Sequence, residues 1–165
     1  MTKLNFIPLL FACTIGFSQP IQKEINEQVW KPFIKSYNDY RADDFLALHS
    51  KDVIRSARDS KKVWNWDQYL QSQSEGDKRE LLAKSKRTLS LRFTERLNNA
   101  NQALDVGIFQ VLYQLPDGTK ESYYGRFHVA LRKENGHWKI LVDTDSTEDG
   151  KIGERDFLAA SPMEP

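Results

Sequence analysis

The chain has 165 residues, of which 39% are hydrophobic and 28% charged, and its 24 basic and 23 acidic side chains give a net charge of +1. This length suits one domain of ordinary size and is too short for two. The near balance of charge argues against a nucleic-acid binder, which usually carries a clear basic excess. A single Cys excludes a disulfide within the chain and a zinc site built on cysteines.

Residues 1–18 have the pattern of a secretory signal peptide. Lys3 supplies a short positive region, an apolar run follows, and Gly16 and Ser18 provide small residues before a cut after Ser18. The apolar run is shorter than the roughly 20 residues that a membrane-spanning helix needs, so no membrane span is expected. We therefore expect an exported protein, periplasmic or secreted, whose single mature domain covers residues 19–165.

Cys13 leaves an alternative open at this end of the chain. The segment Leu10-Phe11-Ala12-Cys13 resembles a bacterial lipobox, in which the Cys becomes a lipidated first residue. The apolar run continues beyond Cys13, however, whereas a lipoprotein usually turns polar there. A cut after Ser18 removes the only Cys and one Lys, which leaves 23 basic and 23 acidic side chains and a formal charge of 0 (23 − 23).

The first half of the mature chain has a helical pattern. Apolar residues recur every four positions and form one face of an amphipathic helix, at Ile21, Ile25, Val29, Phe33 and Tyr37. Pro32 lies inside this helix and is expected to kink or restart it. The pattern then predicts a short helix from Phe45 to His49, a short strand at Val53–Ile54, and a helix over 67–84 that is interrupted near Gly76.

After Arg87 the apolar period changes from about 3.6 to 2, which is typical of half-buried strands. Four long strands are predicted, at 88–97, 104–114, 122–133 and 138–143, separated by turns at 98–101, 116–118 and 135–136. In the second strand, Leu104, Val106 and Ile108 define the expected apolar face, which places Asp105 on the other face. A polar acidic loop and a short helix, at about 145–160, close the chain.

Helices followed by an antiparallel meander indicate an α+β fold. We expect a cone-shaped domain in which N-terminal helices pack on a curved antiparallel sheet of four long strands plus one short strand. The open end of such a cone is expected to hold a cavity.

Two segments of the chain resemble the nuclear transport factor 2-like (NTF2-like) superfamily. Residues 30–49 with 52–54 are similar to its helical opening, and residues 125–143 are similar to its last hairpin, with a Gly-aromatic strand, an Asn-Gly turn and Trp-Lys-Ile. The resemblance is closest to the SnoaL-like and DUF4440-like branches. It implies the cone fold, a pocket and a homodimer formed through the sheet, but not a particular reaction, because this superfamily supports many activities.

Aromatic side chains are the expected lining of the pocket: Tyr37, Tyr40, Trp64, Trp66 and Trp138. The first hypothesis for the function is a non-catalytic binder of a small apolar or amphipathic ligand. The second is an enzyme of the isomerase, dehydratase or cyclase kind, with Tyr37 and Asp143 as the acid/base pair. The third is an association module without a small-molecule site, which would meet its partner, such as a second copy, through the polar sheet face.

Residues 145–156 resemble a calcium-binding loop. Oxygen ligands would come from Asp145, Thr147 and Asp149 at positions 1, 3 and 5, Gly150 is at position 6, and Asp156 is at position 12. Thr147 and Asp156 depart from the usual Asp/Asn and Glu, and a predicted strand enters the loop where a helix is usual. An acidic solvated loop is the simpler interpretation, so no cofactor is expected and Ca²⁺ stays an open alternative. The three His residues show no metal-binding spacing.

Overall fold

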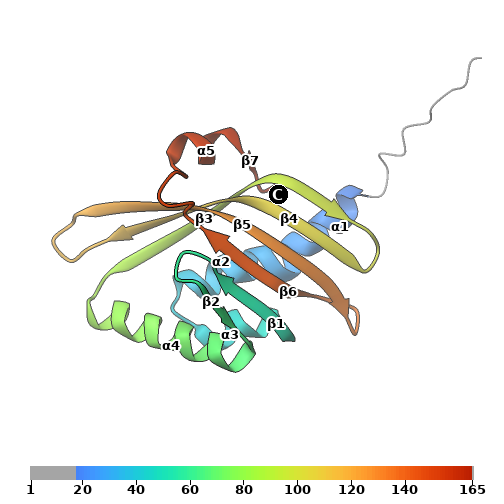
Figure 1. Ribbon diagram of the computed structural model, residues 1–165, viewed down its shortest axis with the longest axis horizontal. Helices are drawn as coiled ribbons and strands as arrows, with labels where there is room; N and C mark the ends of the chain where they lie inside the picture. Colours follow the sequence, from blue (N-terminus) through green and yellow to red (C-terminus); the bar gives the residue numbers. More distant parts are fainter. Residues whose placement is uncertain (1–17, 165) are drawn as a thin grey trace, which may run out of the picture.

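The computed structural model describes residues 18–164 (Figure 1). Apart from Ser18, the predicted signal peptide and its Cys13 lie outside the described residues. The helices are α1 (Ser18–Ile25), the π-helix η1 (Asn26–Trp30), α2 (Lys31–Asn38), α3 (Ala42–Ala47), α4 (Trp66–Leu82) and α5 (Glu154–Ala159). The strands are β1 (His49–Ala57), β2 (Lys62–Trp64), β3 (Lys86–Asn98), β4 (Gln102–Gln114), β5 (Lys120–Glu134), β6 (His137–Ser146) and β7 (Ser161–Pro162).

The strands form one mixed sheet in the order β2-β1-β6-β5-β4-β3-β7. The predicted meander of four long antiparallel strands is confirmed as β3 to β6. The expectation of a purely antiparallel sheet is corrected, because β1 pairs in parallel with β6. The chain makes α4 and three more long strands between β1 and β6, and such a long connection lets it return in the same direction.

The short elements near β1 also differ from their predicted bounds. The helix α3 ends at Ala47, so His49 begins a strand of nine residues and does not end a helix. The helix α4 runs through Gly76 without interruption, and Asn65 starts it with a capping box shared with Gln68.

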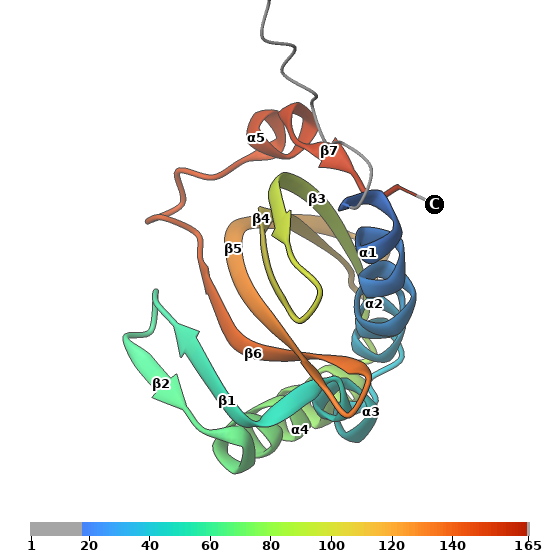
Figure 2. The same ribbon diagram turned by 90° about the vertical axis from the view of Figure 1, so that its right-hand side faces the viewer.

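The helices α1, η1 and α2 follow one another as a single rod along one side of the curved sheet (Figure 2). Pro32, in the first turn of α2, has no N–H to donate to the preceding turn. The turn before it is wound as a π-helix, in which the Lys31 N–H bonds to the carbonyl of Asn26, five residues earlier. The irregularity that Pro32 predicts therefore takes the form of a π turn within a continuous rod.

The main core lies between this rod and the concave face of the sheet. Its buried members include Ile25, Val29, Trp30, Phe93, Phe127, Leu131, Trp138 and Ile140. On the opposite, convex face, α5 packs against β4 (Figure 1). Ile108 of β4 forms a small buried cluster there with Ile152 and Phe157.

The face assignment of β4 is corrected by this arrangement. Asp105 is 1% exposed and points to the inner side of the sheet, together with Ala103 and Val111, whereas Leu104 remains 37% exposed. Both faces of β4 carry apolar residues, so alternation alone could not identify the inner one. The apolar Ile108 lies on the outer face, where α5 shields it from solvent.

Two reciprocal Gly–Phe pairs join β4 and β5 where the sheet curves. Gly107 is the register partner of Phe127, and Gly125 is the register partner of Phe109. A Cβ atom on Gly107 would lie 2.1 Å from the carbonyl oxygen of Arg92 and 2.5 Å from Phe127 Cζ. Each phenyl ring therefore packs directly on the glycine opposite it, where a larger residue would clash with the ring.

Replacing Gly107 by Ala is expected to lower the free energy of unfolding by about 3 kcal/mol, because backbone and a core ring must both move. Urea denaturation followed by Trp fluorescence measures the change. Gly76→Ala is the matched control, since its nearest contact would be 3.8 Å away in the middle of α4, and it should stabilise the protein by about 0.5–1 kcal/mol. Equal stability of the two variants would contradict the packing role of Gly107.

Candidate functional site

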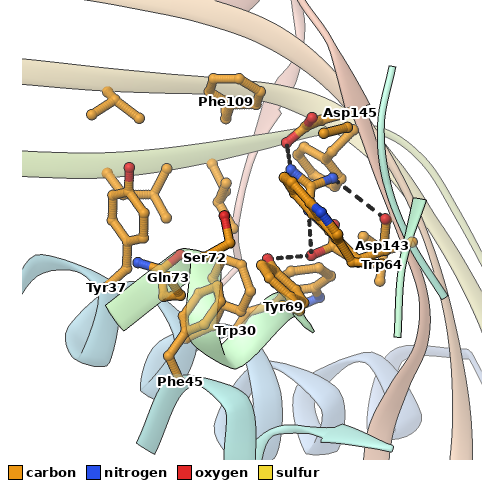
Figure 3. Close-up of a pocket in the computed structure, with 18 residues that line it drawn as sticks. Trp30, Tyr37, Phe45, Trp64, Tyr69, Ser72, Gln73, Phe109, Asp143 and Asp145 are labelled. Carbon is orange, nitrogen blue, oxygen red and sulfur yellow. Dashed lines mark hydrogen bonds and ion pairs between the residues drawn. The ribbon is translucent and has the colours of Figure 1, made fainter. Parts of the chain in front are cut away.

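A cavity of about 310 Å³ opens between the concave face of the sheet and the helices (Figure 3). Its apolar wall combines aromatic and aliphatic side chains from the helical rod, α3 and the inner faces of β3, β4 and β5: Trp30, Phe33, Tyr37, Phe45, Leu89, Leu91, Phe109, Val111, Phe127 and Val129. Its polar groups come from β1, α4 and β6: Arg55, Ser72, Gln73, Asp143 and Asp145, with Tyr69 beside them.

Trp30 is fixed in the wall by a buried polar contact behind it. Its Nε1–H donates to Asp105 Oδ2 at 2.7 Å, and Arg96 binds the same carboxylate at 3.0 and 3.1 Å. Asp105 is therefore paired behind the wall and does not line the cavity. Its role is to hold the indole.

The polar end of the cavity is built by the parallel pairing of β1 and β6. Arg55 is the register partner of Asp143, and Ala57 is the partner of Asp145, so the two carboxylates lie two residues apart on the same face beside one guanidinium. Arg55 donates to Asp145 Oδ2 at 2.7 Å, and its Nε lies 3.8 Å from Asp143 Oδ2. One cation is thus shared by two acids.

Asp143 has further partners at its buried end. The Tyr69 hydroxyl donates to Asp143 Oδ2 at 2.8 Å, and His49 Nε2 lies 3.5 Å from the same oxygen. The other imidazole nitrogen, Nδ1, donates to the carbonyl of Phe45 at 3.0 Å. Burial opposes ionisation of Asp143, but the charge of Arg55 and the contacts with His49 and Tyr69 outweigh it and lower the pKa of Asp143 to about 2.

The predicted pair of Tyr37 and Asp143 does line one cavity, but in Figure 3 the two residues lie on opposite sides of it. Burial raises the pKa of Tyr37, and the Arg87 guanidinium stacks 3.8 Å from its ring centre. A carboxylate with a pKa of about 2 is a weak base near neutral pH. Asp143 is therefore better suited to orient Tyr69 and Arg55 than to move protons.

Asp145 differs from Asp143 in exposure and in the direction in which its pKa is shifted. Its side chain is 32% exposed, compared with 8% for Asp143. Burial and the nearby charge of Asp143 raise the pKa of Asp145, with Arg55 opposing them. Asp145 is thus a carboxylate that solvent or a ligand can reach. The sequence pattern predicted it as a ligand of a calcium loop and not as a cavity residue.

Only two of the five aromatic residues predicted for the pocket, Tyr37 and Trp64, line this cavity. The Tyr40 hydroxyl donates to the carbonyl of Ser85, and Trp66 Nε1 donates to the carbonyl of Leu46. Trp138 is 1% exposed in the main core. These three residues support the wall or the fold from outside the cavity lining.

Three residues of the predicted calcium loop have other partners. Asp145 binds Arg55, and Asp156 Oδ2 accepts from the Gly153 N–H at 3.0 Å as the cap of α5. The backbone N–H of Thr147 donates to Asp59 Oδ2 at 2.7 Å. Among residues 18–164, no three His, Cys, Asp or Glu side chains are grouped so that they could hold a metal ion.

Sequence reasoning missed Arg55 and Tyr69 as site residues. Arg55 could have been found, because Val53, Arg55 and Ala57 occupy alternate positions and so share one face of β1. Only two residues of this strand were predicted, however. Tyr69 lies one turn into α4 and is 6% exposed. Whether the Tyr69 side chain points into the cavity depends on how α4 packs on β1, and no local sequence pattern determines that packing.

Replacing Tyr69 by Phe should lower the free energy of unfolding by about 1–3 kcal/mol, because a buried carboxylate loses a hydrogen-bond donor while the ring is kept. Urea denaturation provides the measurement. Tyr123→Phe is the control: Tyr123 is 52% exposed, and its change should stay within about 0.5 kcal/mol. A Tyr69→Phe variant as stable as the control would show that the hydroxyl contributes nothing to the cluster.

Within residues 18–164, no helix combines the length and the hydropathy required to cross a bilayer.

Searches with family models and against curated proteins find no match to the chain. Solved structures do match it. An NTF2-like protein of unknown function from Shewanella oneidensis MR-1 aligns over 75% of this chain and 98% of its own, with 19% identity and a TM-score of 0.59.

Two further structures extend the comparison. An NTF2-like protein with a cystatin-like fold from Novosphingobium aromaticivorans covers 90% of this chain and 98% of its own, at 12% identity and a TM-score of 0.66. A protein of unknown function from Mycobacterium tuberculosis covers 89% and 95%, at 11% identity and a TM-score of 0.65. Together with the helical rod on a curved, open sheet, these matches establish that the chain has the nuclear transport factor 2-like fold.

Proposed function

We propose that the protein binds a small apolar or amphipathic ligand in the cone cavity and does not transform it. The observation that carries this proposal is a cavity of about 310 Å³ with an aromatic wall and one polar end, which is the usual composition of a small-molecule site. We further propose that it belongs to the SnoaL-like or DUF4440-like branch, and that residues 1–18 direct its export.

Unsatisfied hydrogen-bonding capacity at the polar end supports this proposal. Among the described residues, buried Arg55 Nε has no hydrogen-bond acceptor. A buried polar group without a partner is costly, so native structures usually satisfy it with protein, water or ligand. Water, or an acceptor atom of a ligand that has one, would satisfy this donor.

Native mass spectrometry of the protein purified from its host tests the proposal. We expect a small molecule that is retained under gentle conditions and released on denaturation. Ser72→Trp, which places an indole at the cavity lining, should reduce this retention at least about tenfold by filling the space. Ser74→Trp is the control, because Ser74 lies on the same helix outside the cavity lining. Equal retention by both variants would contradict the proposed site.

A second candidate function is an isomerase, dehydratase or cyclase reaction with Asp145 as the base. The raised pKa of Asp145 and its position at the cavity favour this alternative. Incubation of the retained ligand with the protein in D₂O distinguishes the two functions. A base that abstracts a carbon-bound proton would introduce deuterium with the native protein and not with Asp145→Asn, whereas a binder would return the ligand unlabelled.

A further inference from the structure

The charges that line the cavity do not balance when its carboxylates are ionised. The lining contains one basic side chain, Arg55, and two acidic ones, Asp143 and Asp145. Arg55 is held between the two acids, where its side chain is 11% exposed, and it also donates to the carbonyl of Ser56 at 3.0 Å. When both carboxylates are ionised, the lining therefore carries one uncompensated negative charge.

The position of the three groups indicates which charge a ligand would meet. Asp143 is the more buried acid and faces Tyr69 and His49, whose side chain is 0% exposed. Asp145 is the more exposed acid and receives from Arg55 at only one of its oxygens, Oδ2. Asp145 therefore lines the cavity with one carboxylate oxygen, Oδ1, that Arg55 does not occupy.

An aromatic face lies at the same end of the cavity. Figure 3 shows Trp64 with Asp143 and Asp145 on the side away from Tyr37. Trp64 is partly exposed and stacks on Tyr69 with the ring centres 6.4 Å apart. Two basic residues lie near this indole: Arg55 is the register partner of Trp64, and Lys62 Nζ lies 6.0 Å from the ring centre. A carboxylate beside an indole favours a cation, because both attract positive charge.

We propose that the ligand is a hydrophobic amine, whose ammonium group binds Asp145 beside Trp64 and whose hydrocarbon part occupies the aromatic wall. This inference rests on the proposed binding function and names the class of its ligand. An organic acid of the same shape could accept from Arg55 Nε, but it would place its charge against both Asp143 and Asp145. A neutral ligand would leave the extra negative charge of the lining uncompensated.

The test compares three probes of the same shape by calorimetry at about pH 7 and low salt: naphthylmethylamine, naphthylmethanol and naphthoic acid. We expect the amine to bind at least about tenfold more tightly than the alcohol, as a charge-assisted hydrogen bond allows, and the acid to bind most weakly. Low salt keeps the interaction of the partly exposed carboxylate unscreened.

Asp145→Asn should remove the preference of the protein for the amine. The new amide oxygen can still accept from Arg55, and Arg55 and Asp143 then balance each other, so the fold is expected to survive. Affinity for the amine should fall about tenfold while affinity for the alcohol stays within about threefold. Asp117→Asn is the matched control, because it removes the same charge from a hairpin turn and keeps an acceptor for the Thr119 N–H.

The outcomes separate this inference from the function on which it rests. If the alcohol or the acid binds as tightly as the amine, or if Asp145→Asn keeps the preference, the ligand class is wrong and the binding function stands. If none of the three probes binds, both the ligand class and the binding site are contradicted.

Discussion

Replacing Arg55 by Met is expected to lower the free energy of unfolding by about 3–5 kcal/mol near pH 7, the usual cost of removing one partner from a buried ion pair. The variant keeps much of the side-chain volume but leaves Asp143, with its side chain 8% exposed, without a counter-charge. Asp145 loses its hydrogen-bond donor at the same time. Urea denaturation followed by Trp fluorescence measures the loss.

The dependence of this loss on pH identifies its cause. In the native protein the pKa of Asp143, about 2, lies below its value in the unfolded chain, so this group stabilises the fold above about pH 4. That contribution is lost as the pH falls toward 2. Without Arg55, burial raises the pKa in the folded state, and protonation relieves the unpaired charge. The deficit of Arg55→Met should therefore be largest near pH 7 and shrink as the pH falls through about 4.

Arg58→Met is the matched control for this experiment. Arg58 follows β1 closely in the chain, and its side chain is exposed, so its replacement should change stability by less than about 0.5 kcal/mol. A deficit of Arg55→Met that is the same at about pH 7 and about pH 4 would show that packing, and not charge, explains it.

Replacing Arg87 by Met should have an effect of similar size, about 3–5 kcal/mol, at a second buried ion pair. Arg87 binds Asp77 at 2.7 Å and Glu80 at 3.1 Å, both on α4, and its Nε donates to the carbonyl of Tyr37 at 2.8 Å. It thereby joins α2, α4 and β3. Its guanidinium also stacks on the Tyr37 ring, so this variant loosens one wall of the cavity.

A double variant, Arg87→Met with Asp77→Asn, separates the charge effect from the packing effect. It removes the buried carboxylate that Arg87→Met leaves unpaired, and the amide oxygen that replaces it can still accept from Gln73 as Asp77 does. The double variant should therefore be more stable than Arg87→Met alone. Lys86→Met, at the neighbouring exposed position, should change little. A double variant that is less stable than Arg87→Met would contradict the unpaired-charge explanation.

The long strands and their turns were predictable because their signals are local. Alternation over ten or more residues defines β3 to β5, and a shorter alternation after the Asn135-Gly136 turn defines β6. The structure extends each strand by only a few residues. The parallel pairing of β1 with β6 was not predictable in this way. It depends on residues that are almost 90 positions apart, such as Arg55 and Asp143.

The candidate site shows the same division between local and distant information. Trp64 was identified because aromatic residues at junctions often line cavities, and Tyr37 because of its position on the first helix. Both line the cavity. Trp138 has the same chemistry but faces the closed part of the core. The Arg55 cluster escaped notice because its acids were assigned to a catalytic pair and to a calcium loop, and only the sheet register brings them together.

The end of the described chain has a consequence for how the protein is made. The segment α5–β7 covers Ile108 on the convex face and pairs with β3, a thirteen-residue strand on the outer side of the meander. At the other edge of the sheet β2 has three residues, so it offers little backbone to another chain. Because α5–β7 is synthesised after all four long strands, Ile108 and the part of β3 at Arg92 and Phe93 have no cover from this segment for a time. During that interval the chain is most open to pairing with its neighbours, and chaperone binding would be most useful.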